Sequence, residues 1–493
     1  MTVTTLDLAS VGMFIDGQLR PALDDATAVD VNPATGETIC EVAYGSLADL
    51  DAAVAAARRA HDVDGWPLLP AVQRARLLLA IADGIEARAE EMALRETLDV
   101  GKPIQFTRSF DVAAAASGFR YYAGMVEQLA GVAHRAGTSS LAYTRRESLG
   151  VVGAITPFNF PLNLAVNKIA PALAAGNTVV LKPAEQTPLS VLLLAEIMSD
   201  AGLPPGVFNV ITGDGPQLGS AMSVHPGIDK IAFTGSTSVG KQLVAAAAGT
   251  LKRVTVELGG KGANIVFDDA DLPAAVAAAF QAAFFNSGQF CMSGSRLLVQ
   301  RGVYREMVDA ISAAATAAAV GDPLDPSTMI GPLAHQAQFD RVEYYVALGK
   351  SEGATLTAGG APGAGPNWDG RGFFYLPTVF ADADPNMAIA QDEIFGPVLT
   401  VIPFDDEDEA IAIANGTPYG LAAGLHTCDL SRAHRVAARL QAGIVWVNTW
   451  AAFENSTSFG GYKQSGYGRE LGPEGIEEYL QTKTVYVGLE NAG

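Results

Sequence analysis

The stretch Leu149–Lys182, with the sequence LGVVGAITPFNFPLNLAVNKIAPALAAGNTVVLK, contains the alternation that decides the fold. Residues 149–155 and 178–182 are short apolar runs of the length of strands. The residues between them have helical spacing, and Gly176 with Asn177 ends the helix. Two parallel strands need a crossover of this length, usually a helix, so the stretch predicts a βαβ unit.

The same alternation continues along the chain in two series. Apolar runs at 207–212, 228–233 and 253–257 extend the first series, with helical stretches between strands. A second series begins at residue 263, and its last strand is predicted at 444–448. Repeated units of strand, helix and strand predict parallel sheets with helices on both faces. We therefore predict an α/β protein with two Rossmann-like parallel-sheet domains.

Two further β-prone stretches, 139–148 and 482–489, lie outside both series. An isolated hairpin is only marginally stable in water, so each of these ribbons needs other strands to pair with. Pairing between subunits would supply such strands, and we therefore expect a homo-oligomer. Residues 358–372 are rich in Gly, Pro and Ala, which predicts a surface loop.

The composition excludes several classes of partner. The 493 residues include 32 Lys and Arg against 53 Asp and Glu, which gives a net charge of −21. A surface this acidic repels nucleic-acid backbones and anionic lipids, so neither is an expected partner. The longest apolar stretches are interrupted by Asn, Lys, Gln or Pro, and none predicts a membrane span.

Cysteine and histidine usage indicates the compartment and the absence of a metal site. The chain has three cysteines, Cys40, Cys291 and Cys428, which is not the pattern of a disulfide framework. No secretory signal opens the sequence, so we expect a reducing, cytoplasmic location. The six histidines lack metal-ligand spacing, and we predict no metal site.

Phe233–Gly240, FTGSTSVG, lies between a predicted strand and a predicted helix. Gly235 allows a sharp turn, Ser236 adds a hydroxyl, and the helix start offers free N–H groups to a phosphate. The segment is neither the usual G-x-G-x-x-G fingerprint nor a P-loop, because no Ser or Thr follows Lys241. Taken alone, it fits a plain strand-to-helix turn as well.

Two other segments have residues suited to a nucleotide. Lys182 and Glu185 follow a predicted parallel strand, where ligands of open sheets bind, and could hold the hydroxyls of a ribose. Glu185 would repel a 2′-phosphate, which favours NAD over NADP. In Gln391–Pro397, QDEIFGP, Glu393 could hold a second ribose and Phe395 could lie against a flat ring. The alternatives are a solvated charged turn and a plain loop.

Three segments contain residues suited to covalent chemistry. Cys291 lies in NSGQFCMSGSR, where small neighbours leave room for a substrate and backbone N–H groups could stabilise an oxyanion. Glu257 ends an apolar strand, and partial desolvation would raise its pKa toward that of a general base. The amide of Asn159 could also face an oxyanion. Alone, the three residues fit a buried thiol, a carboxylate paired with Lys261 and a turn asparagine.

Together these segments resemble the aldehyde dehydrogenase superfamily, of the hydrolytic, NAD(P)-dependent kind that does not acylate CoA. The resemblance begins at Phe14-Ile-Asp-Gly17 and Asn32-Pro-Ala-Thr-Gly36 and continues to Phe459-Gly-Gly-Tyr-Lys-Gln-Ser-Gly-Tyr-Gly-Arg-Glu470. It covers nearly the whole chain, with each signature in the family's order. Such an order is not expected of unrelated turns that each have an ordinary explanation.

The resemblance implies an NAD-dependent aldehyde dehydrogenase with a defined set of catalytic residues. Cys291 matches the catalytic thiol, Glu257 the general base and Asn159 the oxyanion amide. Lys168 matches a lysine near the glutamate, in a proton relay. The implied reaction oxidises an aldehyde to a carboxylic acid: the Cys291 thiolate attacks the carbonyl, hydride passes to NAD, and water activated by Glu257 hydrolyses the thioester.

The resemblance also implies residues that bind the cofactor and the substrate. The cofactor positions match Ile155, Thr156, Lys182, Glu185, Phe233, Gly235, Ser236, Leu258, Gln338, Glu393 and Phe395. The substrate tunnel matches Phe160, Asn163, Leu164, Asn167, Phe290, Met292, Trp450, Phe453 and Phe459. None of these tunnel residues is basic, so we expect a medium-sized aliphatic or aromatic aldehyde. Two positions depart from many relatives, because Phe158 replaces a Trp and Asn167 replaces an aromatic residue.

The implied fold has a cofactor domain, a catalytic domain and a β-ribbon that bridges subunits. On this sequence the NAD-binding domain would comprise residues 1–129 and 149–259, and the catalytic domain residues 260–479. The bridging, oligomerising ribbon would comprise residues 130–148 and 480–493. A homodimer or homotetramer is expected from the resemblance.

Three other functions remain to be weighed. A CoA-acylating enzyme of the same fold generally lacks the base at the position of Glu257. A thiol esterase that ignores NAD would leave the segments around Lys182 and Glu393 without a role. A non-catalytic binding protein on the same scaffold is disfavoured because Cys291, Glu257 and Asn159 are all present, although fold alone would not exclude it.

Overall fold

The stretch that predicts the fold forms the middle of the first sheet. Val151–Ile155 is strand β8, Pro161–Ala174 is helix α6 and Thr178–Lys182 is strand β9. Every residue of both strands is buried, as expected for apolar strands that are covered on both faces. The two strands pair in parallel, which confirms the predicted βαβ unit.

The computed structural model describes residues 10–137, 139–365 and 368–489. Within these residues the first sheet has eight strands. Their order across the sheet is β20 (Gly466–Tyr467), β12 (Arg253–Glu257), β11 (Lys230–Thr234), β8, β9, β10 (Phe208–Val210), β2 (Met13–Ile15) and β3 (Gln18–Arg20). Strands β12 to β10 are parallel, and antiparallel strands flank them. The chain order reverses between β8 and β11, which is where ligands of such sheets bind.

Helices cover both faces of this sheet. One face carries α1 (Leu47–Asp62), α8 (Gly215–Val224) and α9 (Thr237–Ala247). The other face carries α2 (Ala71–Ala87), α3 (Ala89–Val100), α5 (Val112–Met125), α6 and α7 (Leu189–Asp200). Alternate strand residues face the two cores, since Leu181 belongs to the second core and Val180 to the first.

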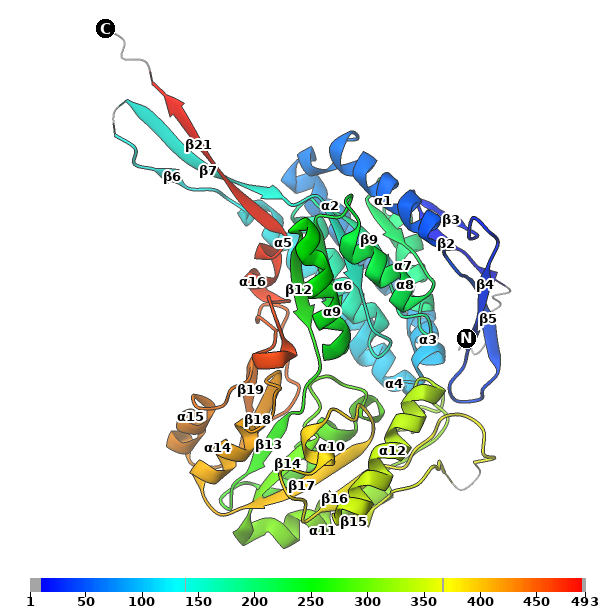
Figure 1. Ribbon diagram of the computed structural model, residues 1–493, viewed down its shortest axis with the longest axis vertical. Helices are drawn as coiled ribbons and strands as arrows, with labels where there is room; N and C mark the ends of the chain where they lie inside the picture. Colours follow the sequence, from blue (N-terminus) through cyan, green and yellow to red (C-terminus); the bar gives the residue numbers. More distant parts are fainter. Residues whose placement is uncertain (1–9, 138, 366–367, 490–493) are drawn as a thin grey trace.

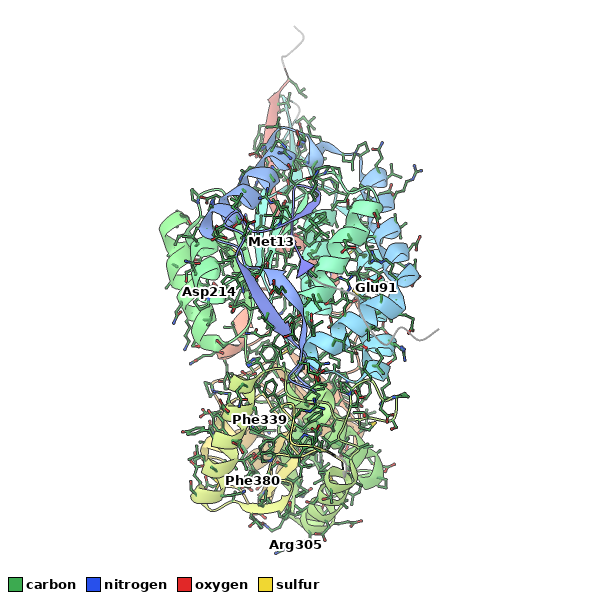
Figure 2. The ribbon with its side chains drawn as sticks, turned by 90° about the vertical axis from the view of Figure 1, so that its right-hand side faces the viewer. Met13, Glu91, Asp214, Arg305, Phe339 and Phe380 are labelled. Carbon is green, nitrogen blue, oxygen red and sulfur yellow. The ribbon has the colours of Figure 1, made fainter. Side chains whose placement is uncertain are left out.

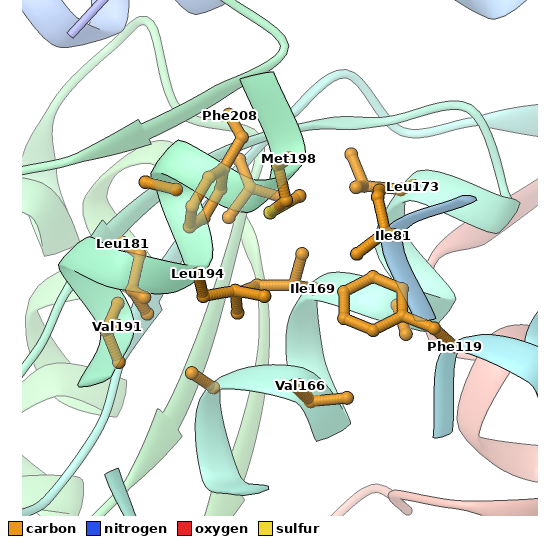
Figure 3. Close-up of a cluster of buried hydrophobic side chains, with 14 of the residues drawn as sticks. Ile81, Phe119, Val166, Ile169, Leu173, Leu181, Val191, Leu194, Met198 and Phe208 are labelled. Atoms are coloured by element: carbon orange, nitrogen blue, oxygen red, sulfur yellow. The ribbon is translucent and has the colours of Figure 1, made fainter. Parts of the chain in front are cut away.

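Figure 3 shows the centre of the second of these cores. Leu194 and Met198 of α7 pack with Phe208 of β10, and Phe119 of α5 lies near Ile169 of α6. All of these side chains are at most 1% exposed. Their burial fixes α6 against the sheet, and α6 carries Lys168 and the residues predicted to line the substrate tunnel.

The second sheet confirms the second predicted series. Its strands within the described ranges are, in spatial order, β15 (Thr355–Ala358), β16 (Thr378–Ala381), β17 (Val398–Phe404), β14 (Arg296–Gln300), β13 (Ala263–Val266), β18 (Ala422–His426) and β19 (Ile444–Val447). All neighbours except β15 and β16 pair in parallel. Helices α10 (Leu272–Phe284) and α11 (Tyr304–Ala317) cover one face, and α12 (Gln336–Glu352), α14 (Glu407–Asn415) and α15 (Leu430–Ala437) cover the other.

The two sheets form two bodies of one elongated molecule (Figure 1). Figure 2 shows Met13, Glu91 and Asp214 in the body around the first sheet, and Phe339 and Phe380 in the other. Strand β20 belongs to the first sheet although it follows the last strand of the second in sequence. The chain therefore returns to the first body after completing the second.

Three strands form an arm that projects from the first body (Figure 1): β6 (Ala133–His134), β7 (Ser140–Ser148) and β21 (Leu480–Gly488). Strand β21 pairs with β7 in antiparallel register from Leu480 opposite Ser148 onward. We expected the two β-prone stretches to need strands from another subunit. That expectation was wrong for the edges along which β7 and β21 face each other, because these two strands pair with each other within one chain.

Helix α7 is capped by a side chain from another helix. It begins after Pro188, and the N-cap residue Pro188 provides no side-chain hydrogen bond. Asp99 accepts a hydrogen bond from the backbone N–H of Leu189 at 2.8 Å instead. A carboxylate from another helix therefore satisfies the free N–H group, which no local pattern could indicate.

No helix within residues 10–137, 139–365 and 368–489 combines the length and the apolar character that crossing a bilayer requires. Residues 1–9 of the predicted NAD-binding domain and residues 490–493 of the predicted ribbon lie outside the described residues.

Candidate active site

Cys291 follows an unusual turn between α10 and β14. Asn286, Ser287 and Gly288 all have positive φ, at 50°, 56° and 71°. A side chain on Gly288 would meet the carbonyl oxygen of Gly396 at 2.0 Å, so only glycine fits there. Strained, positive-φ residues persist where the surroundings fix them, and they concentrate at functional sites. The turn places the Cys291 thiol, partly exposed, at the edge of a cavity.

That cavity has a volume of about 600 Å³ and lies between the two bodies. Asn159 and Leu258 contribute to its wall from the first body, and Glu393 and Phe395 from the second. Cys291 therefore shares one space with residues from four separate motifs. The sequence predicted this grouping only through the family resemblance.

Two glycines after β12 allow the approach of the two bodies. A Cβ atom on Gly259 would meet the Glu393 carboxylate at 2.2 Å, and one on Gly260 would meet the Cys291 carbonyl oxygen at 2.4 Å. The backbone N–H of Gly260 donates to Glu393 Oε1 at 2.9 Å. Larger residues at these positions would push Cys291 and Glu393 away from the strand that ends at Glu257.

Glu257 is the last residue of β12 and is 3% exposed. Neither of its carboxylate oxygens has a hydrogen-bond partner among the described residues. Burial, reinforced by the charge of Glu470, raises the pKa of Glu257 well above its ordinary value, and the charge of Lys168 opposes this shift. Once ionised, a buried carboxylate with a raised pKa binds a proton more strongly than an exposed carboxylate does, which is the property that a general base needs.

Lys168 is fully buried on α6, and its charge acts on Glu257. Its ammonium contacts the Glu470 carboxylate and donates to Thr234 Oγ1 at 2.6 Å. The sequence had indicated a lysine beside Glu257, and Glu470 had received no role although it ends the last family motif. The three ionisable groups interact electrostatically, so Glu470 is a missed member of this cluster.

The surroundings of Cys291 disfavour its thiolate. Burial and the nearby carboxylates of Glu393, Glu257 and Glu470 raise its pKa, and a backbone N–H of Met292 only partly offsets this. A group that accepts the thiol proton would therefore assist attack by the sulfur.

Asn159 is buried and its amide orientation is fixed. Its Nδ2 donates to the carbonyl of Gln289 at 2.9 Å, and the backbone carbonyl of Asn159 accepts from Asn286 Nδ2 at 2.9 Å. A carboxamide nitrogen carries two N–H donors, so one remains for a ligand in the cavity that Asn159 shares with Cys291.

A second cavity, of about 330 Å³, lies beyond the carboxyl ends of β8, β9 and β11. Six of the predicted cofactor positions line it: Ile155, Thr156, Lys182, Glu185, Phe233 and Gly235. The helix residues Gly219, Val239 and Leu243 also contribute to its wall. Gly235 and Thr234 line both cavities, so the two spaces adjoin. An apolar slot beside a polar edge suits a flat base attached to a ribose.

The polar edge of this second cavity is formed by Lys182 and Glu185. The two charged groups lie 3.9 Å apart, and Glu185 accepts a hydrogen bond from the backbone N–H of Gly215. Burial lowers the pKa of Lys182 to about 8, although Glu185 opposes this shift. Both side chains thus have hydrogen-bonding capacity directed at a site where hydroxyl groups could bind.

Ser236 is the N-cap of helix α9. Its hydroxyl accepts from the backbone N–H of Val239 at 3.3 Å, and a Cβ atom on Gly235 would meet the ring of Phe233 at 2.4 Å. The sequence had assigned Ser236 to a phosphate, and the structure shows that it also caps the helix. The start of α9 faces the larger cavity, where its N–H groups would favour an anion.

The loop that contains Glu393 is held by helix α12. Gln338 Nε2 donates to the carbonyls of Ile394 and Phe395, at 3.0 and 2.7 Å. Arg341, one turn further along α12, donates to the carbonyls of Glu393 and Ile394. Gln338 therefore positions the loop, and Arg341, which the sequence did not single out, does the same. Phe395 adopts φ of 63°, and burial raises the pKa of Glu393 to about 7.

The predicted tunnel residues gather on the other side of Cys291. The buried members of this cluster are Phe160, Phe290, Met292, Trp450 and Phe459, and Leu164 and Phe453 pack against them. Three further aromatic residues belong to the cluster and were missed: Phe110, Phe285 and Trp446. Phe285 is stacked on Phe160 with ring centroids 6.1 Å apart. Helical periodicity could not assign these rings to the cluster, because their contacts join segments that are distant in the sequence.

A buried charged network lies behind this aromatic cluster. Lys102 Nζ lies 2.8 Å from Asp111 Oδ1 and 3.9 Å from the centroid of the Phe160 ring. Asn163, predicted to line the tunnel, donates to the same Asp111 oxygen at 2.9 Å. Asp111 ends a short π-helical turn, Thr107–Asp111, of a kind frequent at functional sites. Asn167 lies half-buried on the same side of α6 as Asn163.

Comparison with known proteins agrees with this geometry. The family model of the aldehyde dehydrogenase family matches residues 22–485. An aldehyde dehydrogenase of Enchytraeus buchholzi is 46% identical over 487 residues, which cover 98% of this chain and 97% of that protein. A betaine aldehyde dehydrogenase of Rhizobium leguminosarum bv. trifolii (strain WSM2304) is 45% identical, with 97% of each chain covered.

Solved structures give the same result. The structure of an aldehyde dehydrogenase from Bacillus cereus in complex with NAD⁺ superimposes with a TM-score of 0.95 at 44% identity. The match covers 98% of this chain and 97% of that chain. At this identity and coverage the two chains share the complete fold, including both sheets and the arm.

Proposed function

This chain belongs to the aldehyde dehydrogenase family, and we propose that it oxidises an aldehyde to the carboxylic acid with NAD, through a thioester on Cys291 that water hydrolyses. Aldehyde oxidation follows from the family. The observation that supports the finer proposal is that Cys291 and Asn159 line one cavity together with Ser236, Glu393 and Phe395 of the cofactor motifs.

The two adjoining cavities fit NAD by the chemistry of their walls. The apolar slot between α8 and α9 suits the adenine, with Lys182 and Glu185 at the ribose hydroxyls. The N-terminus of α9 with Ser236 suits the pyrophosphate. Glu393 and Phe395 would hold the nicotinamide riboside near Cys291. Bound NAD supplies a hydride acceptor, and Glu185 disfavours the 2′-phosphate of NADP.

The first step forms a bond between Cys291 Sγ and the aldehyde carbon. The surroundings disfavour the thiolate, so a group that accepts the thiol proton as the bond forms would assist this step. We assign this proton to Glu257, a buried carboxylate whose raised pKa makes it a stronger base than an exposed one. The remaining N–H of Asn159 and the backbone N–H of Cys291 would stabilise the oxyanion of the thiohemiacetal.

The second step returns the enzyme to its starting state. Loss of hydride from the thiohemiacetal carbon leaves a thioester on Cys291. Water then adds to this carbon, and Glu257 accepts the proton of the water. The bond from carbon to sulfur breaks and releases the carboxylic acid, and the leaving thiolate takes up the proton that Glu257 accepted from water. Before this step, Lys168 and Glu470 would pass on the proton that Glu257 accepted from the thiol, so that Glu257 is ionised again when water adds.

The domain roles follow from the same arrangement. We assign residues 1–129 and 149–259 to NAD binding and residues 260–479 to catalysis, with the small return of β20 to the first sheet. The arm, residues 130–148 and 480–493, would join subunits into a homodimer or homotetramer. Exposed apolar side chains on the arm, including Leu141, Tyr486 and Val487, support this assignment.

The substrate proposal rests on the aromatic cluster. Its rings offer no charged group to a substrate, and Lys102 is neutralised by Asp111 behind Phe160. A medium-sized aliphatic or aromatic aldehyde therefore fits better than a charged semialdehyde. The three cysteines are all free thiols, which supports a reducing, cytoplasmic environment.

The test follows reduced nicotinamide by absorbance with a panel of aldehydes, NAD and NADP, in the wild type and in Cys291→Ala. We expect reduction of NAD without added CoA, and its loss in the variant. Reduction that survives the loss of Cys291 would contradict the mechanism. Ester hydrolysis by Cys291 with no reduction of NAD would favour a thiol esterase, and a requirement for CoA would favour an acylating enzyme.

A further inference from the structure

Gln289 precedes Cys291 by two residues in the sequence, and the proposed mechanism gives it no role. It is fully buried, and it is not one of the described residues that line the cavity of Cys291. Both ends of its side-chain amide have a partner. Its Oε1 accepts a hydrogen bond from the backbone N–H of Ala334 at 2.9 Å, and its Nε2 donates to the carbonyl of Asn286 at 3.4 Å. The side chain therefore has a fixed orientation.

The backbone carbonyl of Gln289 contacts Asn159, the residue that we assign to the oxyanion. Asn159 Nδ2 donates to this carbonyl at 2.9 Å. A carbonyl oxygen can only accept a hydrogen bond, so it selects the nitrogen end of the Asn159 amide rather than the oxygen end. Both N–H groups belong to the same nitrogen, so fixing one of them also fixes the direction of the other. The position of the Gln289 carbonyl therefore decides where the free N–H of Asn159 points.

These contacts join segments of both bodies. Asn159 follows strand β8 of the first sheet, whereas Gln289 and Ala334 belong to the second body. Ala334 directly precedes His335, the N-cap of α12. A side chain of α12 also holds the loop that contains Phe395. The start of α12 is therefore a common support for the oxyanion amide and for the cofactor side of the cavity.

The turn before Gln289 needs such support because it is strained. Asn286 and Ser287 both have positive φ, and side chains other than glycine keep this conformation only where their surroundings fix it. Ser287 Oγ donates to the carbonyl of Gly331 at 2.8 Å, close in sequence to the anchor of Gln289. Two side chains thus fasten the turn to the same segment. Of the two, Gln289 is the one whose backbone carbonyl contacts Asn159.

We propose that Gln289 is a positioning residue: its side chain, anchored at Ala334, sets the carbonyl that directs the N–H of Asn159 toward the oxyanion. The inference rests on the proposed function, which assigns Asn159 to that oxyanion. Gln289 then acts on catalysis through Asn159. A residue with a purely structural role would instead impair the enzyme whether the Asn159 amide is present or absent.

The first test compares two substitutions of Gln289. Gln289→Met has a similar length without either hydrogen bond. Loss of an oxyanion donor lowers kcat by about 10²- to 10³-fold, and a misdirected donor should cost part of this, about 10- to 100-fold. KM for NAD should stay within about threefold, because the bond to the loop at Phe395 remains. Gln289→Glu keeps an oxygen for the N–H of Ala334, so its kcat should stay within about fivefold of the wild type.

A double-mutant cycle with Asn159→Ala separates positioning from a structural role. Asn159→Ala alone should lower kcat by about 10²- to 10³-fold. Added to Asn159→Ala, Gln289→Met should change kcat by less than about twofold, because the amide that it positions is gone. A further loss as large as in the wild-type background would overturn the proposal. Wild-type kcat in Gln289→Met alone would overturn it too.

Ser287→Ala is the matched comparison for loosening of the turn. It removes the hydrogen bond to Gly331 and leaves the anchor of Gln289 in place. Its loss of kcat should be at least about fivefold smaller than that of Gln289→Met. Equal losses in the two variants would mean that any loosening of the turn has this effect, and the specific role of Gln289 would be refuted.

Thermal unfolding checks that each variant is folded. If Gln289→Met does not fold, Gln289→Asn takes its place in the same cycle, because its amide is one methylene short of Ala334. Wild-type kcat in Asn159→Ala would remove the oxyanion assignment, and with it both this part of the proposed function and the inference. Impaired Asn159→Ala together with an additive effect at position 289 would remove the inference alone.

Discussion

The two sides of Cys291 are built in different ways. The cofactor side is a cavity of about 600 Å³ whose wall combines glycines, hydroxyl groups and single charged residues from short motifs. The substrate side is a cluster of aromatic rings supported from behind by the buried pair of Lys102 and Asp111. The first side is a set of local turns, and the second is an assembly of residues distant in sequence.

This difference has a physical origin. A phosphate or a ribose is held by backbone N–H groups and short side chains at strand ends, so each contact needs only a few consecutive residues. An apolar tunnel needs a closed ring of bulky side chains, which no single element can supply. Phe110, Phe160, Phe285 and Phe453 come from four separate segments. Four predictions test whether the cofactor side and the substrate side of Cys291 differ in this way.

The largest effect is expected where both sides meet, at Glu257. Glu257→Gln removes the base that accepts protons in both proposed steps, and kcat should fall by about 10²- to 10⁴-fold. Rapid mixing with NAD and an aldehyde measures the first turnover separately from the steady state. Wild-type kcat in this variant would contradict the assignment, and a first turnover at the wild-type rate would limit Glu257 to the hydrolysis step.

The next effect concerns stability on the substrate side. Lys102→Met leaves the Asp111 carboxylate buried without its cation, which should cost about 3–5 kcal/mol of unfolding free energy. The matched control is Lys182→Met on the cofactor side, where the partner Glu185 keeps 34% of its side-chain surface exposed, so the loss should be smaller. Urea denaturation compares the two variants. Equal losses would show that the two sides are not supported differently.

A third, roughly tenfold effect is expected for the cofactor side and depends on pH. Burial raises the pKa of Glu393 to about 7, so its carboxylate, the acceptor of ribose hydroxyls, forms as the pH rises through 7. KM for NAD should therefore decrease between pH 6 and 8 in the wild type. Glu393→Gln should raise KM at pH 8 by about tenfold and make it insensitive to pH. An unchanged pH profile in the variant would contradict this role.

The same shift gives the sign for stability. The pKa of Glu393 is raised on folding from 4.5 to about 7. The protonated side chain therefore stabilises the folded state fully below about pH 4.5, and this stabilisation is lost as the pH rises through 7.

The smallest effect is expected for a tunnel amide. Asn167 is half-buried beside the aromatic cluster, so Asn167→Leu should raise kcat/KM for an apolar aldehyde by about two- to fivefold. Asn163→Leu should instead lower stability, because Asn163 donates to Asp111. Steady-state kinetics and denaturation separate the two. A loss of activity in Asn167→Leu would indicate that this amide holds the substrate.

Much of the fold could be predicted from the sequence. Strands β9 and β12 have the predicted bounds. Strand β9 lies in the centre of a parallel sheet and is buried on both faces, so it appears in the sequence as a short apolar run. The cap of α7 could not be predicted, because the group that caps it, Asp99, belongs to another helix. The pairing of β7 with β21 was also missed, since the two strands are separated by most of the chain.

The candidate site, like the fold, could be predicted from the sequence only in part. The sequence placed Cys291, Glu257 and Asn159 in motifs, and the structure brings Cys291 and Asn159 to one cavity. The sequence did not show that Lys168 is paired with Glu470. It also did not show that the side-chain amide of Gln338 donates a hydrogen bond to the carbonyl of Phe395. Each of these pairings joins residues of one body that are remote along the chain, within the first body for Lys168 and Glu470 and within the second for Gln338 and Phe395.

The sequence by itself determined the βαβ units, the family and the residues at strand ends, because these depend on periodicity and on short turns whose chemistry is local. The raised pKa values of Glu257 and Cys291, the partners of Lys168 and Lys102, and the aromatic cluster beside Cys291 follow only from the tertiary structure. Burial and charge proximity depend on all neighbours in space, and most of those neighbours are remote along the chain.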